Sequence, residues 1–75
     1  MRSILIRVYD RSGSPVSNAR VTLGYGGGVG DSQYTDGNGE TEFRIDSGYP
    51  RIWVYVDGKE LVTDKPAQSE YRVVV

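Results

Sequence analysis

The chain has 75 residues, nine basic and ten acidic, with a formal net charge of −1 and neither cysteine nor histidine. This length predicts a single domain over residues 1–75, and the missing residue types exclude disulfides, zinc sites built from Cys and His, and a histidine general base. The basic residues do not cluster in the sequence, so nucleic-acid binding is not expected. No apolar run reaches the roughly 20 residues that a membrane-spanning helix needs.

Apolar and polar residues alternate through most of the chain with the period of two that is typical of β-strands. In chain order, the runs at residues 4–9, 20–25, 32–35, 41–45, 51–56, 60–63 and 71–75 predict seven short strands. No ten-residue window holds a helical period free of glycine and proline, so no helix is expected. Seven strands separated by frequent turns predict an all-β, two-sheet sandwich.

Turn signals separate these runs. They are the segments 10–16, 24–32, 46–50 and 64–67 and the pair Asp57-Gly58. Asp-Gly between two strands favours a type I′ hairpin, which needs positive φ at both central residues. The side chains expected to face the interior are Ile4, Ile6, Val8, Val21, Leu23, Phe43, Ile45, Ile52, Val54, Val56, Leu61 and Val73.

The stretch TDGNGETEFRI places oxygen-bearing side chains at alternate positions, Asp36, Asn38 and Glu40. This spacing makes them a weak candidate for a calcium site. The segment is shorter than a twelve-residue EF-hand loop and is flanked by strand-like sequence. Because Asp, Asn and Gly tolerate left-handed backbone, we favour a tight turn feeding a strand. No cofactor is therefore expected.

The stretch GYGGGVG resembles a phosphate-binding loop only in its glycine content. The dinucleotide fingerprint needs glycines at i, i+2 and i+5, and counting from Gly24, Gly26 or Gly28 the last position is Val29, Asp31 or Gln33. No helix is predicted to follow. We interpret residues 24–32 as a loop.

Six tyrosines and one tryptophan are many for this length. If the apolar residues of 51–56 face inward, Trp53 and Tyr55 face outward, and by the same alternation Tyr9 lies opposite Val8. A surface carrying Trp53, Tyr55 and Tyr9 would suit stacking against sugar rings or anchoring a protein partner. The alternative is that these rings cover an outer sheet face or pack on another subunit.

No catalytic constellation is visible. A serine nucleophile would need a base, and only Lys59 and Lys65 are available as lysine bases, both in turn-like sequence. The carboxylates of Glu40 and Glu42 share one strand face, where a solvated edge is the usual outcome. The β-prone end, Tyr71 to Val75, either pairs with another chain at a sheet edge or forms an internal strand, and the sequence leaves both open.

Several short segments together resemble the carboxypeptidase regulatory-like domains, which share the transthyretin-like (prealbumin-like) seven-stranded sandwich. They are Val8-Tyr9-Asp10, Gly13, Pro15-Val16, Asn18 to Val21, Thr35 to Glu40 leading to Phe43, and Val54 to Gly58. Invasin-like and collagen-adhesin-like immunoglobulin-type domains carry similar segments. The resemblance implies a transthyretin-like or immunoglobulin-like Greek key. It also implies an accessory or stand-alone binding domain, with any catalysis in another domain of the parent protein.

The transthyretin-like enzymes of purine breakdown rely on histidine, so that activity is not expected here. We expect a non-catalytic structural or protein-interaction module with a protein partner or self-association, and a carbohydrate-binding module as the alternative. The start of the chain has only three consecutive apolar residues, short of the 7–15 of a signal peptide. The expectation is thus a cytoplasmic chain or a domain of a larger protein, and the sequence leaves the compartment open, an extracellular one included.

Overall fold

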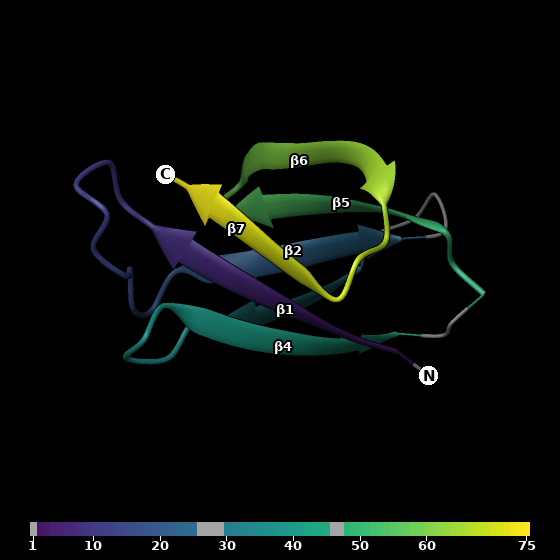
Figure 1. The fold of residues 1–75 in the computed structure, drawn as a ribbon, viewed down its shortest axis with the longest axis horizontal. Helices are drawn as coiled ribbons and strands as arrows, with labels where there is room; N and C mark the ends of the chain where they lie inside the picture. Colours follow the sequence, from purple (N-terminus) through teal and green to yellow (C-terminus); the bar gives the residue numbers. More distant parts are fainter. Residues whose placement is uncertain (1, 26–29, 46–47) are drawn as a thin grey trace.

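The computed structural model describes residues 2–25, 30–45 and 48–75 (Figure 1). These residues form seven strands: β1 (Arg2–Tyr9), β2 (Arg20–Tyr25), β3 (Asp31–Tyr34), β4 (Glu40–Ile45), β5 (Arg51–Val56), β6 (Lys59–Pro66) and β7 (Glu70–Val74). The described ranges contain no helix, so none that could cross a membrane. The loop predictions for residues 26–29 and 46–47 lie outside the described residues. The all-β prediction is confirmed.

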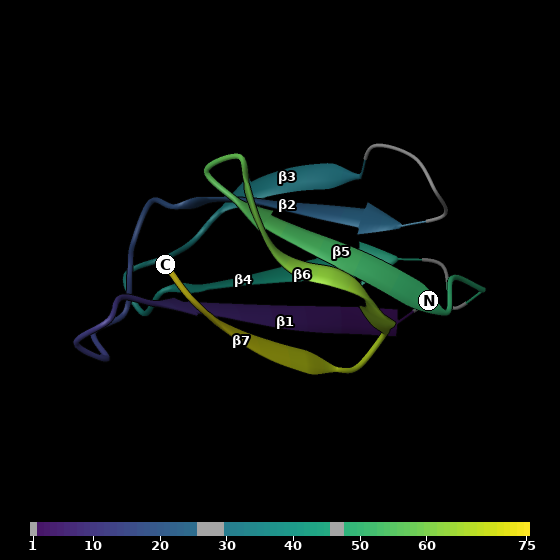
Figure 2. The same cartoon turned by 90° about the horizontal axis from the view of Figure 1, so that it is seen from above.

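The strands form two sheets. β1 is the central strand of a three-stranded sheet of order β4-β1-β7, antiparallel to β4 and parallel to β7 (Figure 1). The other sheet has the order β3-β2-β5-β6 and is antiparallel throughout. Seen from above, the two sheets lie as two layers (Figure 2). Each layer therefore has one face toward the other layer and one outer face.

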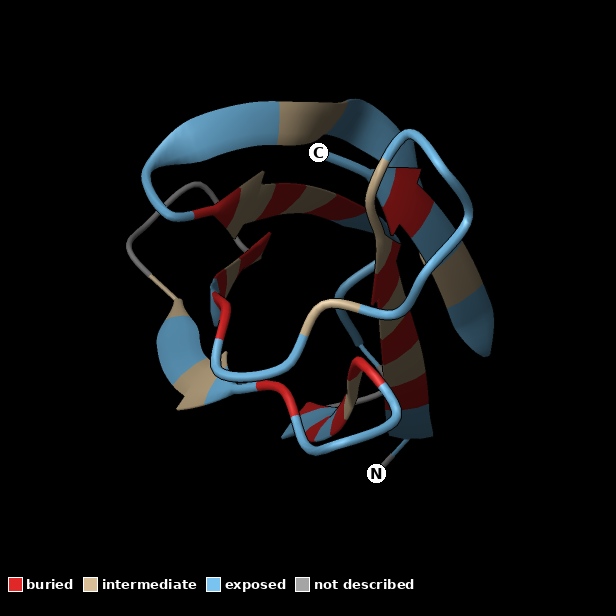
Figure 3. Cartoon of the chain, turned by 90° about the vertical axis from the view of Figure 1, so that its left-hand side faces the viewer, coloured by how far each residue is buried: buried red, intermediate tan, exposed pale blue. Residues whose placement is uncertain are grey.

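The core lies between the layers and follows the alternation in the sequence. Buried residues alternate with more exposed ones along β1, β4 and β5 (Figure 3). The buried hydrophobic residues are Ile4, Ile6, Val8, Ala19, Val21, Leu23, Phe43, Ile45, Ile52, Val54, Val56 and Val73. Every predicted core residue except Leu61 is among them, because strand periodicity determines which side chains face the opposite sheet.

Leu61 and the segment after it differ from the sequence prediction. Leu61 is half-buried at the margin of the core, on a strand whose pairing with β5 contains register shifts. Residues 64–67 were expected to form a turn, but β6 continues to Pro66. Asp64 takes a φ of 50° within the strand, and its carboxylate accepts a hydrogen bond from Arg51 Nε at 2.6 Å. A bulged strand thus accommodates residues typical of a turn.

The predicted turn at Asp36 is confirmed. The Asp36 Oδ1 atom accepts hydrogen bonds from the backbone N–H groups of Asn38 and Glu40, at 2.9 and 3.0 Å. The Gly39 N–H donates to the Asp36 carbonyl, and Gly39 has a φ of 75°. The aspartate side chain therefore replaces a backbone partner, as in an Asx turn.

The Asp57-Gly58 hairpin also has the expected geometry. Both residues have positive φ, 50° and 86°, and they join Val56 directly to Lys59 in the β5–β6 ladder. This is the type I′ pattern.

Thr35 is a buried polar residue that ties two connections together. Its hydroxyl donates to the Val16 carbonyl at 2.6 Å and accepts from the Ala19 N–H at 3.0 Å. The segment before β2 is thereby attached to the segment between β3 and β4. The bond to the Ala19 N–H is buried and the bond to the Val16 carbonyl is partly buried, so this hydroxyl satisfies backbone groups that have little access to water.

Candidate functional site

Trp53 and Tyr55 lie on the outer face of the four-stranded sheet. They alternate with buried residues of β5 and are themselves half-buried. Across the β2–β5 ladder, Trp53 is paired with Gly24 and Tyr55 with Thr22. Gly24, which faces Trp53 in this ladder, is buried.

A row of hydrogen-bonding side chains crosses this face beside the two rings. Thr22 Oγ1 and Ser32 Oγ are 2.8 Å apart, and Tyr55 is paired with Glu60 of β6. The pKa of the Tyr55 phenol is raised, mainly by hydrogen bonding to the Glu60 carboxylate and to a smaller extent by burial. We call Trp53, Tyr55, Thr22, Ser32 and Glu60 the aromatic face. It combines two aromatic rings with hydroxyl and carboxylate groups on one sheet surface.

Tyr9 does not belong to the aromatic face. It projects from β1 on the outer face of the three-stranded sheet, which is the other layer of the sandwich. The expectation that one surface carries Trp53, Tyr55 and Tyr9 is therefore wrong. Alternation within a strand separates inward from outward side chains, but it does not tell which sheet the strand joins.

Tyr9 instead lines a shallow depression of about 380 Å³ at the end of β1 and β7. The other lining residues are Asp10, Arg11, Gly13, Arg72 and Val74. The Asp10 carboxylate is held within its own turn, where it accepts hydrogen bonds from Ser12 and Ser14. The lining therefore also carries the positive charges of Arg11 and Arg72.

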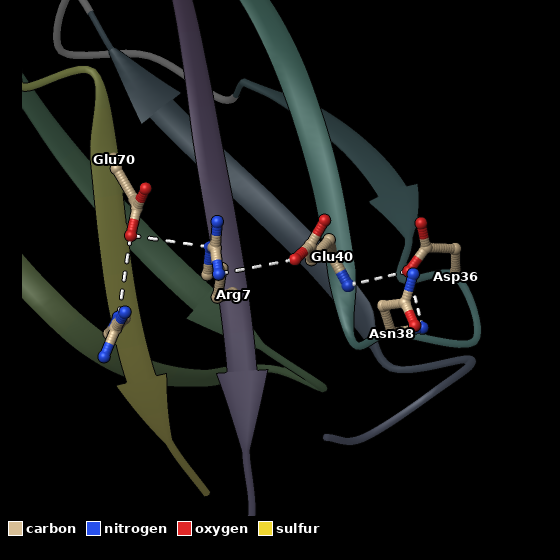
Figure 4. A network of polar contacts seen from close by, with 6 residues as sticks. Arg7, Asp36, Asn38, Glu40 and Glu70 are labelled. Carbon is tan, nitrogen blue, oxygen red and sulfur yellow. Dashed lines mark hydrogen bonds and ion pairs between the residues drawn. The ribbon is translucent and has the colours of Figure 1, made fainter.

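The outer face of the three-stranded sheet carries a chain of charges. Arg7 lies between Glu40 of β4 and Glu70 of β7, with N···O distances of 3.6 and 3.4 Å (Figure 4). Arg72 Nε lies 3.5 Å from the same Glu70 carboxylate, and its side chain is 69% exposed. In the β1–β7 register, Arg72 is paired directly with Arg7. Two like charges therefore stand side by side on the outer face of the sheet, on its central strand and its edge strand.

The free edge of β7 is defined by the hydrogen bonds at its two ends. The Leu5 N–H donates to the Ser69 carbonyl, and the Val75 N–H donates to the Tyr9 carbonyl, both at 2.9 Å. Because successive residues of a strand direct their backbone groups to opposite sides, odd-numbered residues here face β1. The backbone N–H and C=O groups of Glu70, Arg72 and Val74 therefore face away from β1. β7 is the end strand of its sheet.

The other three sheet edges are protected to different degrees. β3 has only four residues, and β6 carries a bulge, two lysines and Pro66. On β4, the backbone N–H and C=O of Glu40 are already bonded to Asp36, at 3.0 and 2.9 Å. Short length, bulges, lysine and proline are the features by which natural sheets block edge pairing. β7 has no proline, lysine or bulge in its pairing.

The calcium candidates Asp36, Asn38 and Glu40 do not converge on one point. Asp36 Oδ1 is directed to backbone N–H donors, and the Glu40 carboxylate is directed to Arg7 on the sheet face (Figure 4). Within the described ranges, no group of three or more acidic side chains is placed to hold a metal ion. The spacing in the sequence is explained by the turn.

Sequence reasoning did not identify Glu70 and Arg72. The alternation places both on an outer face, but their importance depends on the parallel pairing of β7 with β1, which joins segments about 65 residues apart. The lysines considered as catalytic bases, Lys59 and Lys65, are exposed on β6. No family model and no curated protein matches the chain.

Proposed function

We propose that this domain is a non-catalytic protein-interaction module that binds its partner through the free edge of β7. The observation that carries the proposal is the outer edge of β7, where the backbone groups of Glu70, Arg72 and Val74 pair with no other strand of the described residues. An extended segment can add to such an edge by main-chain hydrogen bonds, with alternate side chains giving specificity.

The side chains of β7 fit this role. Val74 is 57% exposed and offers an apolar contact, while Arg72 and Glu70 offer charges of both signs on the same outer face. A partner strand would gain backbone hydrogen bonds and side-chain contacts from one short segment. The remaining edges are shorter, bulged or partly occupied.

We further propose that the sandwich is transthyretin-like. The strand order supports this choice over the immunoglobulin constant-type order, in which the first strand pairs with the second. Here β1 pairs with β4 and β7, and β2 pairs with β3 and β5. The resemblance to carboxypeptidase regulatory-like domains favours the same assignment.

Site-specific photo-crosslinking tests the interaction site. Val74 is replaced by benzoylphenylalanine, and the matched control places the same group at Thr63, an exposed residue of the bulged β6. Irradiation in an extract of the source cells is expected to give a discrete protein adduct from position 74 and none from position 63. Arg72→Pro is expected to abolish the adduct, because it removes an outward N–H and no bond to β1. Equal labelling at both positions, or no adduct at either, would contradict the proposal.

A second candidate function is carbohydrate binding at the aromatic face. The observation that favours it is the pairing of Trp53 and Tyr55 with the hydroxyl and carboxylate groups of Thr22, Ser32 and Glu60. Aromatic rings with adjacent polar groups provide both stacking and hydrogen bonding.

Trp53 is the only tryptophan, so its fluorescence reports directly on this face. A bound sugar is expected to shift its emission, and a glycan array is expected to show binding that Trp53→Ala removes. Tyr9→Ala is the control, since Tyr9 lies on the outer face of the three-stranded sheet, away from the aromatic face. No binding across a broad array would eliminate this candidate.

A further inference from the structure

We propose that the partner at the β7 edge is a second copy of this chain, paired antiparallel through β7 about a twofold axis at Tyr71. The inference rests on the proposed function, because it names the partner of the same edge. The pairing would join two three-stranded sheets into one continuous sheet of six strands.

The twofold symmetry restricts the possible registers. In an isologous contact, a pair formed by residue i of one copy and residue j of the other is repeated by residue j of the first copy and residue i of the second. The hydrogen-bonded pairs must come from residues whose backbone groups face outward. On β7 these are Glu70, Arg72 and Val74. The axis can therefore pass through Tyr71, Arg72 or Val73.

Charge selects among the three registers. An axis at Arg72 places Arg72 opposite the partner's Arg72, and an axis at Val73 leaves Glu70 beyond the end of the partner strand. An axis at Tyr71 places Glu70 opposite the partner's Arg72, and Arg72 opposite the partner's Glu70. Opposite charges directly across a ladder stabilise strand pairing, and like charges oppose it.

The same register compensates the like-charged pair within one copy. Arg72 stands beside Arg7 in the β1–β7 ladder, and Glu40 balances Arg7 from the far side, at 3.6 Å. Addition of the partner's Glu70 next to Arg72 would complete a row of two arginines between two glutamates. The outer face of the three-stranded sheet is thus complementary to itself at this edge.

The edge is short, so a weak dimer is expected. With the axis at Tyr71, residues 70–72 of each β7 lie opposite one another, and they bury much less than a standard interface. Association should therefore depend on concentration over a range of about 1 μM to 1 mM.

Sedimentation equilibrium of the whole chain tests the inference with charge swaps. The wild type is expected to pass from monomer to dimer as its concentration rises. Arg72→Glu and Glu70→Arg each create two like-charged pairs, and each is expected to raise the dissociation constant about tenfold or more. The double variant Glu70→Arg/Arg72→Glu restores opposite charges and is expected to return to within about threefold of wild type.

The matched control is Arg44→Glu. Arg44 is an exposed arginine on the other edge strand of the same sheet, so the change in net charge is identical to that of Arg72→Glu. It should leave the dissociation constant unchanged. Unfolding midpoints of all variants show whether the domain still folds, and Arg72→Pro gives a second disruption that does not depend on charge.

The outcomes separate this inference from the proposed function. A wild type that stays monomeric throughout, single swaps that bind as well as wild type, or a double swap that fails to restore pairing would each overturn the dimer. If the chain is monomeric while position 74 crosslinks to a different protein, the second copy is refuted and the β7 interaction site stands. If the chain is monomeric and position 74 forms no adduct, both are refuted.

Discussion

Substitution of Gly39 by alanine, compared with the same substitution at other glycines, separates the cost of left-handed backbone from the cost of a steric collision. A Cβ atom at this position would lie 2.6 Å from the Val8 carbonyl oxygen and 3.0 Å from both Pro15 Cβ and Val16 N. The residue also has a φ of 75°. Gly39→Ala therefore introduces left-handed backbone strain and a collision with backbone atoms of β1.

The magnitude follows from these two effects. Left-handed backbone costs a residue with a side chain roughly 1–2 kcal/mol, and overpacking costs about 1–3 kcal/mol more. Together they reduce the free energy of unfolding by about 2–5 kcal/mol. Domains of this size are stable by only about 3–5 kcal/mol, so a large fraction of the variant should be unfolded.

Two other glycines are matched controls. Gly13 has a φ of 90°, and a Cβ atom added there would meet nothing within 4 Å, so Gly13→Ala should show the strain alone, about 1–2 kcal/mol. Gly37 lies in the same turn as Gly39, has no such φ and has equally open space. Gly37→Ala should change stability by less than about 1 kcal/mol.

Urea unfolding followed by tryptophan fluorescence and circular dichroism measures all three variants. The expected order of destabilisation is Gly39→Ala, then Gly13→Ala, then Gly37→Ala. If Gly39→Ala loses no more stability than Gly13→Ala, the close approach to Val8 has no energetic consequence and the reasoning from the contact distance is refuted.

Two further predictions concern hydrogen bonds of single side chains. Thr35→Val removes the hydroxyl that pairs with the Val16 carbonyl and the Ala19 N–H, and it should lower the free energy of unfolding by about 2–4 kcal/mol. Thr35→Ser keeps the hydroxyl and should retain most of the stability. Equal losses of the two variants in urea unfolding would contradict this. The Ser12 hydroxyl, with nearby backbone N–H groups, lowers the pKa of the Asp10 carboxyl from 3.8, so its contribution to stability is present above pH 3.8 and is lost as the pH falls through the lowered pKa. Carbon-detected NMR titration should show this pKa rise toward 3.8 in Ser12→Ala, and an unchanged value would disprove the role of that hydroxyl.

The fold could be predicted from the sequence where local rules decide. Alternation identified every buried hydrophobic residue of β1, β4 and β5, and Asp57-Gly58 identified its hairpin, because both depend only on neighbouring residues. Leu61 was misassigned because the bulge between β5 and β6 depends on a register that arises only when the two strands pair.

The candidate site could be predicted less well than the fold. Trp53 and Tyr55 face outward together, as expected from their spacing on one strand. Tyr9 lies on the other sheet, and the Arg7–Glu70–Arg72 group joins the first strand to the last. Such groupings are set by sheet topology, which the periodicity of individual strands does not encode.

The parallel pairing of β1 with β7 also has a consequence for folding kinetics. Leu5 and Glu70 are neighbours across this ladder, so the central strand of one sheet lacks its β7 partner until about 65 further residues have been synthesised. The chain loses the entropy of closing this long loop before the β1–β7 contacts can stabilise it. This favours slow folding, in the range of milliseconds to seconds. During translation, β1 would therefore leave the ribosome well before β7 and would remain incompletely paired until β7 emerges.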